Sequence, residues 1–390
     1  MKKFIFIAVS FLFIISCTSE IMEMNDGGTT FTQVVETSDI NKITEEQALD
    51  IANKILTRTR ANTNISVSYV LNENNPITRS AGVSDTLAYI FNYGVNNGFA
   101  VIASDNRVFP LLVFSETGHF AYEEDGNDPI YACFVSRIDD YLATADENDT
   151  IITIPDDFMS TCYWTAPLLE TSGWSQGAPY DKYVKMEHPG CPTGCVAVAT
   201  AQIMINCKKS FYYHDSLYRC HAITEGLKTH RTKIVGGDPD SVICSYETAV
   251  DHAARLLYWV GKDLYINYTP NGSSGSSYSA RSFLSRLGYD VKESTLISFS
   301  DTAIANRIDE NRLIYFDGRL MSNTSNGHAW IIDGYGFNCS APEIMIFHCD
   351  WGWGGNHNGF YSSVGYYCGD VFAIPDYEYG NMKYFSVKIN

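Results

Sequence analysis

Cys195 follows a glycine and opens a run of small and apolar residues, Val196 to Ala199, that is typical of a tightly packed helix. A thiol at a helix N-terminus lies at the positive end of the helix dipole, among unpaired N–H groups. Both features favour the thiolate, which is the reactive form. A buried structural cysteine is also common for this residue type. Cys195 is therefore a candidate nucleophile that needs a partner.

His328 lies in the segment Gly327-His328-Ala329-Trp330, ahead of an apolar strand that ends in Asp333. Such a strand would hold the imidazole rigidly at its start. A neutral imidazole can take the proton of a thiol and later return it to the leaving amine of a cleaved peptide bond. The chain has nine histidines, so this setting, and not the residue type, makes His328 the candidate base.

Asp350 begins the segment Asp350-Trp351-Gly352-Trp353. A hairpin between His328 and Asp350 could bring the carboxylate to the far ring nitrogen, where it would fix the tautomer and orientation of the imidazole. Trp351 and Trp353 could cover that hydrogen bond and exclude water. A packed turn, with glycines making room for the indoles, is the alternative interpretation of this segment.

Gln176 lies upstream of the cysteine in Trp174-Ser175-Gln176-Gly177. Acyl transfer needs hydrogen-bond donors aimed at the developing oxyanion. The side-chain amide of Gln176 could provide one donor and the backbone N–H of Cys195 the other. An exposed glutamine in a turn is equally consistent with this segment.

The elements that must position these residues can be read from hydrophobic periodicity. Apolar patterns predict helices at 195–207, 246–260 and 278–287, and strands of one antiparallel sheet at 313–316, 328–334, 344–348 and 384–389. Upstream, Thr44 and Gln47 form a capping-box pattern at the start of a predicted helix that extends to Leu56. Strands are expected at 65–71, 86–93, 99–104 and 110–114, with a hairpin turn at 96–98 and a helix at 130–145. The fold class is therefore α+β in both halves.

The first seventeen residues are expected to be a targeting signal. A basic start, Met1-Lys2-Lys3, precedes an apolar stretch that is too short to span a bilayer. The stretch ends in Ser16-Cys17, which resembles the lipobox of bacterial lipoproteins, in which the cysteine is lipidated. An ordinary signal peptide with a chance cysteine is the alternative. No later segment is long and apolar enough to cross a membrane, so only lipid would hold the protein at a membrane.

Together these segments resemble the streptopain-like cysteine peptidases, a branch of the papain-like group. The residues that carry the resemblance are Gln176, GCVAVATAQIM around Cys195, GHAWIIDGY around His328, and WGWGG after Asp350. The segment NGFAVIASD at 97–105 is similar to the family's propeptide. The resemblance implies a papain-like peptidase with a helical half and an antiparallel-sheet half, preceded by a small α+β prodomain. It also implies a zymogen, peptide-bond hydrolysis of polypeptide substrates, and the propeptide as intramolecular inhibitor.

The resemblance also divides the chain and suggests a substrate site. We expect a lipoprotein signal peptide at 1–17, a linker at 18–40, an inhibitory propeptide domain at 41–155 and the peptidase domain at 156–390. A family loop places Ser276 and Ser277 near the substrate cleft, together with Gly327. The family usually has asparagine where this chain has Asp350. A full negative charge there is expected to raise the pKa of His328. The departure also leaves open whether Asp350 orients His328 directly or a backbone group of the tryptophan loop does.

The bulk composition excludes some classes of function. The formal net charge of −18 argues against a nucleic-acid partner, which requires a basic surface. The chain has no CxxC pair, so a zinc ribbon has no support, and the proposed chemistry needs no metal or organic cofactor. We expect an exported protein, a lipoprotein at the bacterial cell surface or outer membrane, from which the mature domain could be released by processing.

Two alternatives remain open at this stage. Transglutaminases and arylamine acetyltransferases also use cysteine, histidine and aspartate in this order, with an amine in place of water. A non-catalytic surface binding protein on a protease scaffold is the second alternative. Self-cleavage near residues 146–162 that depends on Cys195 would favour the peptidase over acyl transfer. Failure of Cys195 to react with a thiol alkylator, after removal of the first half, would favour the binding protein.

Overall fold

The computed structural model describes residues 41–56, 64–71, 86–107, 109–120, 154, 162–229, 233–234, 242–294, 301–319, 327–338, 341–362 and 384–389. The chain divides into two units, Met1–Asp39 and Ile40–Asn390, and every described residue belongs to the second. The expected signal peptide with Cys17, the linker and the helix at 130–145 lie outside the described residues, as does nearly all of the connector at 146–160.

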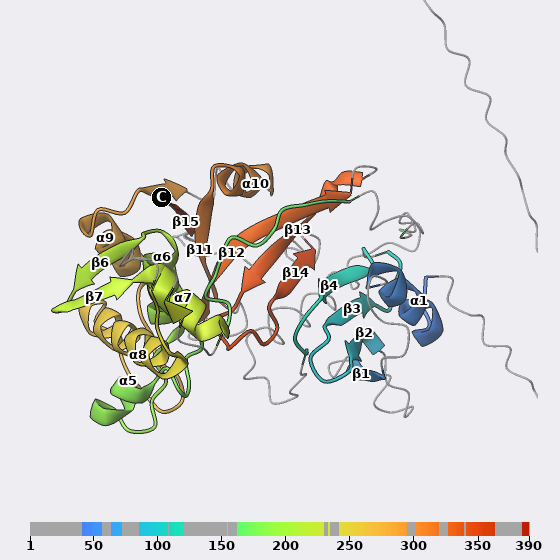
Figure 1. Ribbon diagram of the computed structural model, residues 1–390. Helices are drawn as coiled ribbons and strands as arrows, with labels where there is room; N and C mark the ends of the chain where they lie inside the picture. Colours follow the sequence, from blue (N-terminus) through green and yellow to red (C-terminus); the bar gives the residue numbers. More distant parts are fainter. Residues whose placement is uncertain are drawn as a thin grey trace, which may run out of the picture. The chain divides into compact units, whose positions relative to one another are not determined.

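One 11-stranded sheet runs through the second unit (Figure 1). Its strand order is β1-β2-β3-β4-β14-β13-β12-β11-β15-β10, and β5 pairs with β12. Its strands are β1 (Ile65–Leu71), β2 (Thr86–Tyr93), β3 (Phe99–Ala103), β4 (Leu111–Ser115), β5 (Cys162–Trp164), β10 (Val291–Ser294), β11 (Arg312–Arg319), β12 (Gly327–Asn338), β13 (Ala341–Asp350), β14 (Gly359–Ser362) and β15 (Tyr384–Lys388). Two separate hairpins pair β6 (Ser210–Tyr213) with β7 (Ser216–Arg219), and β8 (Lys233–Ile234) with β9 (Val242–Ile243).

The described helices are α1 (Glu45–Ile55), α5 (Lys182–Glu187), α6 (Cys195–Asn206), α7 (Cys220–Thr229), α8 (Tyr246–Asp263), α9 (Ser277–Arg286) and α10 (Asp301–Asp309). They confirm the predicted α+β class, with most helices between the two groups of strands in the sequence. The predicted helices at 195–207, 246–260 and 278–287 correspond to α6, α8 and α9. Sequence periodicity missed α5, α7 and α10. Among the described residues, none of the helices is apolar over a length that could cross a membrane.

The described part of the N-terminal half folds as the sequence predicts. The Thr44 hydroxyl accepts a hydrogen bond from the Gln47 N–H, and the Gln47 side chain accepts one from the Thr44 N–H, so the capping box is present. Strands β2 and β3 form the expected antiparallel hairpin. The buried face of α1, which includes Ala48 and Ala52, packs on these strands and closes a small core.

Strand β12 separates two hydrophobic cores because its side chains alternate between the faces of the sheet. Ala329 and Ile331 belong to the core formed with α6, α8 and α9. Trp330 and Ile332 belong to the core on the opposite face, which also contains residues of α10. His328 stands at the start of this strand, so its backbone is anchored between two packed layers.

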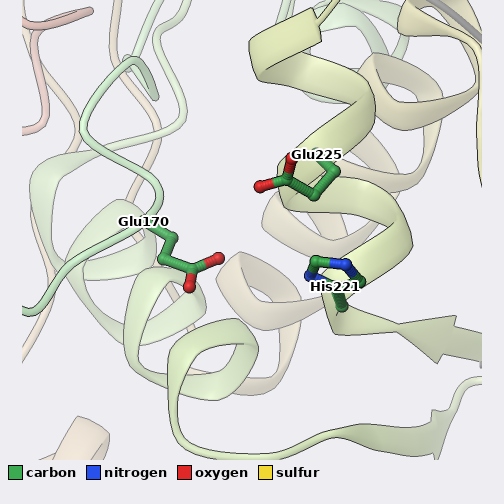
Figure 2. Close-up of side chains that lie close together, drawn as sticks. All are labelled: Glu170, His221 and Glu225. Atoms are coloured by element: carbon green, nitrogen blue, oxygen red, sulfur yellow. The ribbon is translucent and has the colours of Figure 1, made fainter. Parts of the chain in front are cut away.

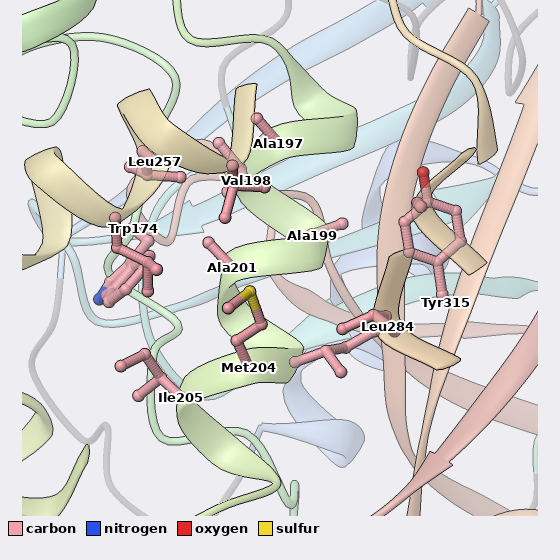
Figure 3. Packing of buried hydrophobic residues seen from close by; sticks show 14 of the residues in the cluster. Trp174, Ala197, Val198, Ala199, Ala201, Met204, Ile205, Leu257, Leu284 and Tyr315 are labelled. Atoms are coloured by element: carbon pink, nitrogen blue, oxygen red, sulfur yellow. The ribbon is translucent and has the colours of Figure 1, made fainter. Parts of the chain in front are cut away.

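Helix α6 is buried along nearly its whole length. Every residue from Val196 to Ile205 is buried, as expected for a helix without a polar face. Figure 3 shows its alanines, valine and methionine packed among side chains of the surrounding elements, including Trp174, Leu257 and Leu284. The small side chains allow α8 and the sheet to approach closely, which holds the first residue of the helix, Cys195, in a defined position.

Strands β4 and β14 join the N-terminal and C-terminal halves. They are antiparallel, with Phe114 opposite Phe360 and Val113 opposite Tyr361. The rings of Phe114 and Phe360 stack at a centroid distance of 5.3 Å, and Trp164 contacts both rings edge-on. Sequence analysis did not predict this continuous sheet, because nothing local in either strand specifies a partner so far away in the chain.

Candidate active site

Cys195 is the first residue of α6 and follows Gly194, whose φ of 89° is favourable only for glycine. The residue is half-buried, and its sulfur receives a backbone hydrogen bond from Ala329, the residue after His328. Burial raises the pKa of the Cys195 thiol, and the backbone hydrogen bonds from Ala329, Val196 and Cys195 itself only partly oppose this. Burial thus opposes the thiolate that the helix N-terminus is expected to favour.

His328 is held by a backbone group. Its Nε2 lies 2.9 Å from the carbonyl oxygen of Trp351. A carbonyl can only accept, so Nε2 carries the proton and Nδ1 is the nitrogen left to exchange a proton in the neutral ring. Burial lowers the pKa of His328 to about 4, while the bond to Trp351 raises it in part. The expected upward shift from Asp350 is therefore wrong, because burial is the largest influence and Asp350 does not contact the ring.

Of the two groups left open for orienting His328, the backbone of the tryptophan loop lies against the ring and the Asp350 carboxylate does not. The Asp350 carboxylate is fully buried and accepts hydrogen bonds from Gln202, from the Gly352 N–H and from Asn358. It stands opposite Ile331 in the β12–β13 register, three residues beyond His328. That register directs the carboxylate to α6 and the following loop, and the next residue's carbonyl reaches the imidazole instead.

Trp351 and Trp353 lie where the sequence suggested, against the imidazole. The ring centroids of Trp353 and His328 are 4.6 Å apart, and those of Trp351 and His328 are 6.0 Å apart. Trp351 is buried and Trp353 is half-buried. Indole rings at these positions limit the access of water to the imidazole and to its hydrogen bond with the carbonyl, which accounts for the strong effect of burial on His328.

Gln176 is hydrogen-bonded to the loop before Cys195. Its backbone carbonyl accepts hydrogen bonds from the N–H of Thr193, at 2.9 Å, and from the Thr193 hydroxyl, at 3.3 Å. Thr193 is two residues before Cys195. The structure therefore brings half-buried Gln176 to the N-terminal end of α6, and the role of its side-chain amide toward an oxyanion remains a prediction.

The three residues predicted to bind substrate have different surroundings. Ser276 caps α9 by accepting a hydrogen bond from the Ser279 N–H. The Ser277 hydroxyl is buried and lies 2.7 Å from the Asp317 carboxylate. Gly327 is exposed at the start of β12. Only Ser276 and Gly327 are accessible, so for Ser277 we expect an indirect effect on substrate binding, by holding β11 to α9.

Sequence reasoning missed Gln202 and Asn358, which hold Asp350 in place. Gln202 had a readable signal, since it is a polar residue in the middle of an apolar helix. Asn358 had none. Sequence reasoning also did not assign a role to Asp333 in GHAWIIDGY: its carboxylate pairs with His348 at 2.6 Å and accepts from the Leu169 N–H at 2.8 Å. Asp333 thereby ties residue 169 to the sheet.

Among the residues that the structure describes, metal-ligating groups converge at Glu170, His221 and Glu225. Figure 2 shows the two α7 residues, His221 and Glu225, facing Glu170 across the gap between their segments. The three ligand atoms lie within 4.8 Å of one another. The ammonium group of Lys228 lies 3.6 Å from Glu170 and 3.2 Å from Glu225, so a cation of the chain itself already balances these carboxylates.

Comparisons with known proteins agree with this arrangement. Residues 174–361 match the Peptidase C10 family, and residues 40–138 match the Spi protease inhibitor family. Streptopain of Streptococcus pyogenes is 26% identical over 327 residues, covering 72% of this chain and 74% of streptopain. The thiol protease/hemagglutinin PrtT of Porphyromonas gingivalis is 26% identical over 323 residues, covering 74% of this chain but 35% of PrtT.

A solved structure of a prointerpain A fragment from Prevotella intermedia has the same fold. It superposes with a TM-score of 0.52 at 20% identity and covers 82% of this chain and 98% of the fragment. The match spans both the inhibitor-like half and the peptidase half. The chain is therefore a streptopain-like cysteine peptidase, made as a zymogen with an Spi-type inhibitor domain in its N-terminal half.

Proposed function

We propose that this zymogen is an exported endopeptidase in which Cys195 is the nucleophile and His328 the general base and acid. The observation that carries the proposal is the pair of backbone contacts around the site. The Cys195 sulfur receives a hydrogen bond from Ala329, while the adjacent His328 is held through Nε2 by the Trp351 carbonyl. Nδ1 is then the nitrogen available to the thiol, as a Cys–His pair requires.

In the proposed reaction, Nδ1 of His328 takes the proton of the Cys195 thiol, and the sulfur attacks the scissile carbonyl carbon. The oxyanion is stabilised by the Cys195 N–H and the Gln176 side-chain amide. Collapse of the intermediate breaks the C–N bond, and the imidazolium gives its proton to the leaving amine. Water then loses a proton to Nδ1 and attacks the thioester, which releases the acid and restores the thiol.

The N-terminal half acts as the intramolecular inhibitor in this proposal, and residues 146–162 as the segment that is cut. The match to the Spi protease inhibitor family and the pairing of β4 with β14 support an inhibitory domain that remains bound to the peptidase. We keep the boundaries at 41–155 for the propeptide and 156–390 for the peptidase, and polypeptides as substrates.

Export and lipid attachment are a separate part of the proposal. Their support is the apolar stretch at 4–15 followed by Ser16-Cys17. Labelling cells that express the full chain with a fatty-acid analogue should mark the wild-type protein, whereas Cys17→Ser should stay unlabelled. Equal labelling of both would contradict lipid attachment at Cys17 without affecting the catalytic assignment.

The catalytic assignment is tested with the full-length precursor. We expect wild type to trim itself near residues 146–162 and Cys195→Ala to remain intact, because the substitution removes the sulfur. N-terminal sequencing of the product identifies the cleavage site. Incubating Cys195→Ala with a trace of processed wild type serves as a control, since the intact variant should then be cut. Trimming of pure Cys195→Ala would exclude Cys195 as the nucleophile.

A further inference from the structure

The loop that follows Asp350 contains a group of buried hydrogen bonds in which three donors converge on one carboxylate. Oδ1 of Asp350 accepts from Nε2 of Gln202 at 3.1 Å and from the Gly352 N–H at 3.0 Å. Oδ2 accepts from Nδ2 of Asn358 at 2.8 Å. Asp350 is 0% exposed, Gln202 1% and Asn358 8%, so these bonds form away from solvent, where hydrogen bonding is strong.

One peptide group connects this carboxylate to the imidazole. The Gly352 N–H and the Trp351 carbonyl belong to the same planar trans peptide unit, so they point in opposite directions. The N–H donates to Asp350, and the carbonyl accepts from Nε2 of His328 at 2.9 Å. Fixing the N–H therefore fixes the direction of the carbonyl. The carboxylate also polarises the peptide, which makes the carbonyl a stronger acceptor.

The amide side chains of Gln202 and Asn358 hold the Asp350 carboxylate and the backbone around Trp351 in place. Gln202 lies seven residues after Cys195 on α6, two helical turns away, and so links the helix of the nucleophile to the carboxylate. Asn358 uses its other atom, Oδ1, to accept from the Trp351 N–H at 3.0 Å. The peptide groups on both sides of Trp351 are thus held, one by Asp350 and the other by Asn358.

We propose that Gln202 and Asn358 are positioning residues for His328, acting through the Asp350 carboxylate and the peptide group between Trp351 and Gly352. This inference rests on the proposed role of His328 as the base. It also accounts for aspartate at position 350. An asparagine there would turn an NH₂ group toward one of the three donors, and Asn358 cannot reverse its amide without losing its bond to the Trp351 N–H.

The pKa of Asp350 predicts how activity should depend on pH. The pKa of Asp350 is raised to about 7, mainly by burial. The charge of Asp333 also raises it, whereas the hydrogen bonds from Gln202 and Gly352 and the charge of His348 lower it. The network needs the ionised form, because all its partners donate. Activity is thus expected to rise with pH through about 7. His348 and Asp333 are the other titratable groups that face Asp350. Asp333→Asn removes the carboxylate that pairs with His348, so this variant controls for the titration of both.

The first test measures the kinetics of processed variants. Each variant is prepared as the full-length precursor and cut by tagged wild-type enzyme, which is then removed through its tag. For Gln202→Leu and Asn358→Asp we expect kcat to fall about 10- to 100-fold with little change in KM, because the base is misplaced and not the substrate. The acidic limb of the pH profile should move up by about one pH unit, since each change removes a donor to the carboxylate. Asn206→Leu is the control: Asn206 bonds Thr171 and the Gln202 backbone, but not Asp350.

The second test exchanges the partners. Asp350→Asn places two donors face to face and Asn358→Asp two acceptors, whereas the double variant D350N/N358D restores one donor and one acceptor. We expect the double variant to recover part of the kcat that each single variant loses. Recovery is expected to be incomplete, because Asn358 also donates to the Ser172 carbonyl. A double variant no better than the worse single one would overturn the proposal.

The third test needs no activity. Nitrogen-15 NMR of the histidines in a full-length Cys195→Ala precursor, which cannot trim itself, should show the Nε2–H tautomer at His328, assigned with His328→Asn in the same background. Gln202→Leu should mix the two tautomers, and Asn206→Leu should not. Wild-type kinetics and tautomer in both Gln202→Leu and Asn358→Asp would refute the positioning role. Hydrolysis by His328→Asn would instead refute the proposed function, so the two failures are distinct.

Discussion

At the scale of single residues, both members of the candidate dyad are neutral in the precursor. Burial raises the pKa of Cys195 and lowers that of His328 to about 4, so thiol and imidazole predominate at neutral pH. We therefore expect proton transfer between them to accompany the reaction with substrate and not to precede it. Because the base is held by the Trp351 backbone, no side-chain substitution at Trp351 removes that hydrogen-bond acceptor directly.

The first prediction concerns the reactivity of this thiol. In the intact precursor, iodoacetamide should modify Cys195 at least tenfold more slowly at pH 7 than it modifies a free cysteine, whose pKa is about 8.5. The rate should increase only as the pH rises above that value, because thiolate is the reactive form. Peptide mass spectrometry of Cys195 across pH 6–10 measures this. Rapid modification that is independent of pH between 6 and 8 would contradict a raised pKa.

At the scale of elements, the start of α6 depends on a tight contact with the segment before α9. A Cβ atom at position 194 would lie 3.1 Å from both the Cβ and the carbonyl oxygen of Ser273. The Ser273 hydroxyl donates to the Pro192 carbonyl at 2.7 Å, which ties the two segments together. Glycine at 194 therefore satisfies two conditions, the positive φ and the absence of a side chain.

The second prediction separates these two conditions. Gly190 also has a positive φ, of 80°, but a Cβ there would meet no atom within 4 Å. Gly190→Ala should cost about 1–2 kcal/mol of unfolding free energy from backbone conformation alone. Gly194→Ala should cost more, about 2–4 kcal/mol, because it adds steric overlap to the same strain. Urea unfolding of both precursors measures the difference, and equal losses would show that the Ser273 contact is unimportant.

The helices and strands also show what sequence periodicity can predict. The capping box at Thr44 and the predicted strands at 65–71 and 86–93 are confirmed, because caps and alternation depend on neighbouring residues. The bounds of β11, β12 and β13 extend beyond the predicted runs. Those extensions are stabilised by pairing with adjacent strands, which a local pattern does not contain.

At the scale of the molecule, the inhibitor-like half contacts the loop that holds His328, the candidate base. Besides the β4–β14 pairing, the ring of Phe120 lies 4.7 Å from that of His357, which in turn lies 5.9 Å from Trp353. Trp353 contacts His328. A continuous series of ring contacts thus joins the N-terminal half to the imidazole, and removal of that half would free one side of the tryptophan loop.

The third prediction tests the sheet junction. A Cβ at position 359 would lie 2.6 Å from the carbonyl oxygen of Phe114, and its nearest contacts all belong to Phe114 and Ser115 of the N-terminal half. Gly359→Ala should therefore separate β14 from β4, lower the melting temperature of the precursor by several degrees and speed self-processing. The processed form should be affected much less.

Gly173→Ala is the matched control for that prediction, since a Cβ there meets no atom within 4 Å. The melting temperatures of precursor and processed protein, and the time course of cleavage, are compared for both variants. Unchanged stability and processing in Gly359→Ala would show that the β4–β14 contact does not restrain the precursor.

By itself, the sequence determined the chemical groups and the local elements: a thiol at the start of an apolar helix, an imidazole at the start of a strand and a tryptophan loop after a carboxylate. These follow from residue type and short-range periodicity. It did not determine which group holds the imidazole. That was decided by the β12–β13 register and the bonds from Gln202 and Asn358, which turn Asp350 away and present the Trp351 carbonyl. Every residue carries the same backbone carbonyl, so only the tertiary structure could show that the carbonyl of Trp351 holds His328.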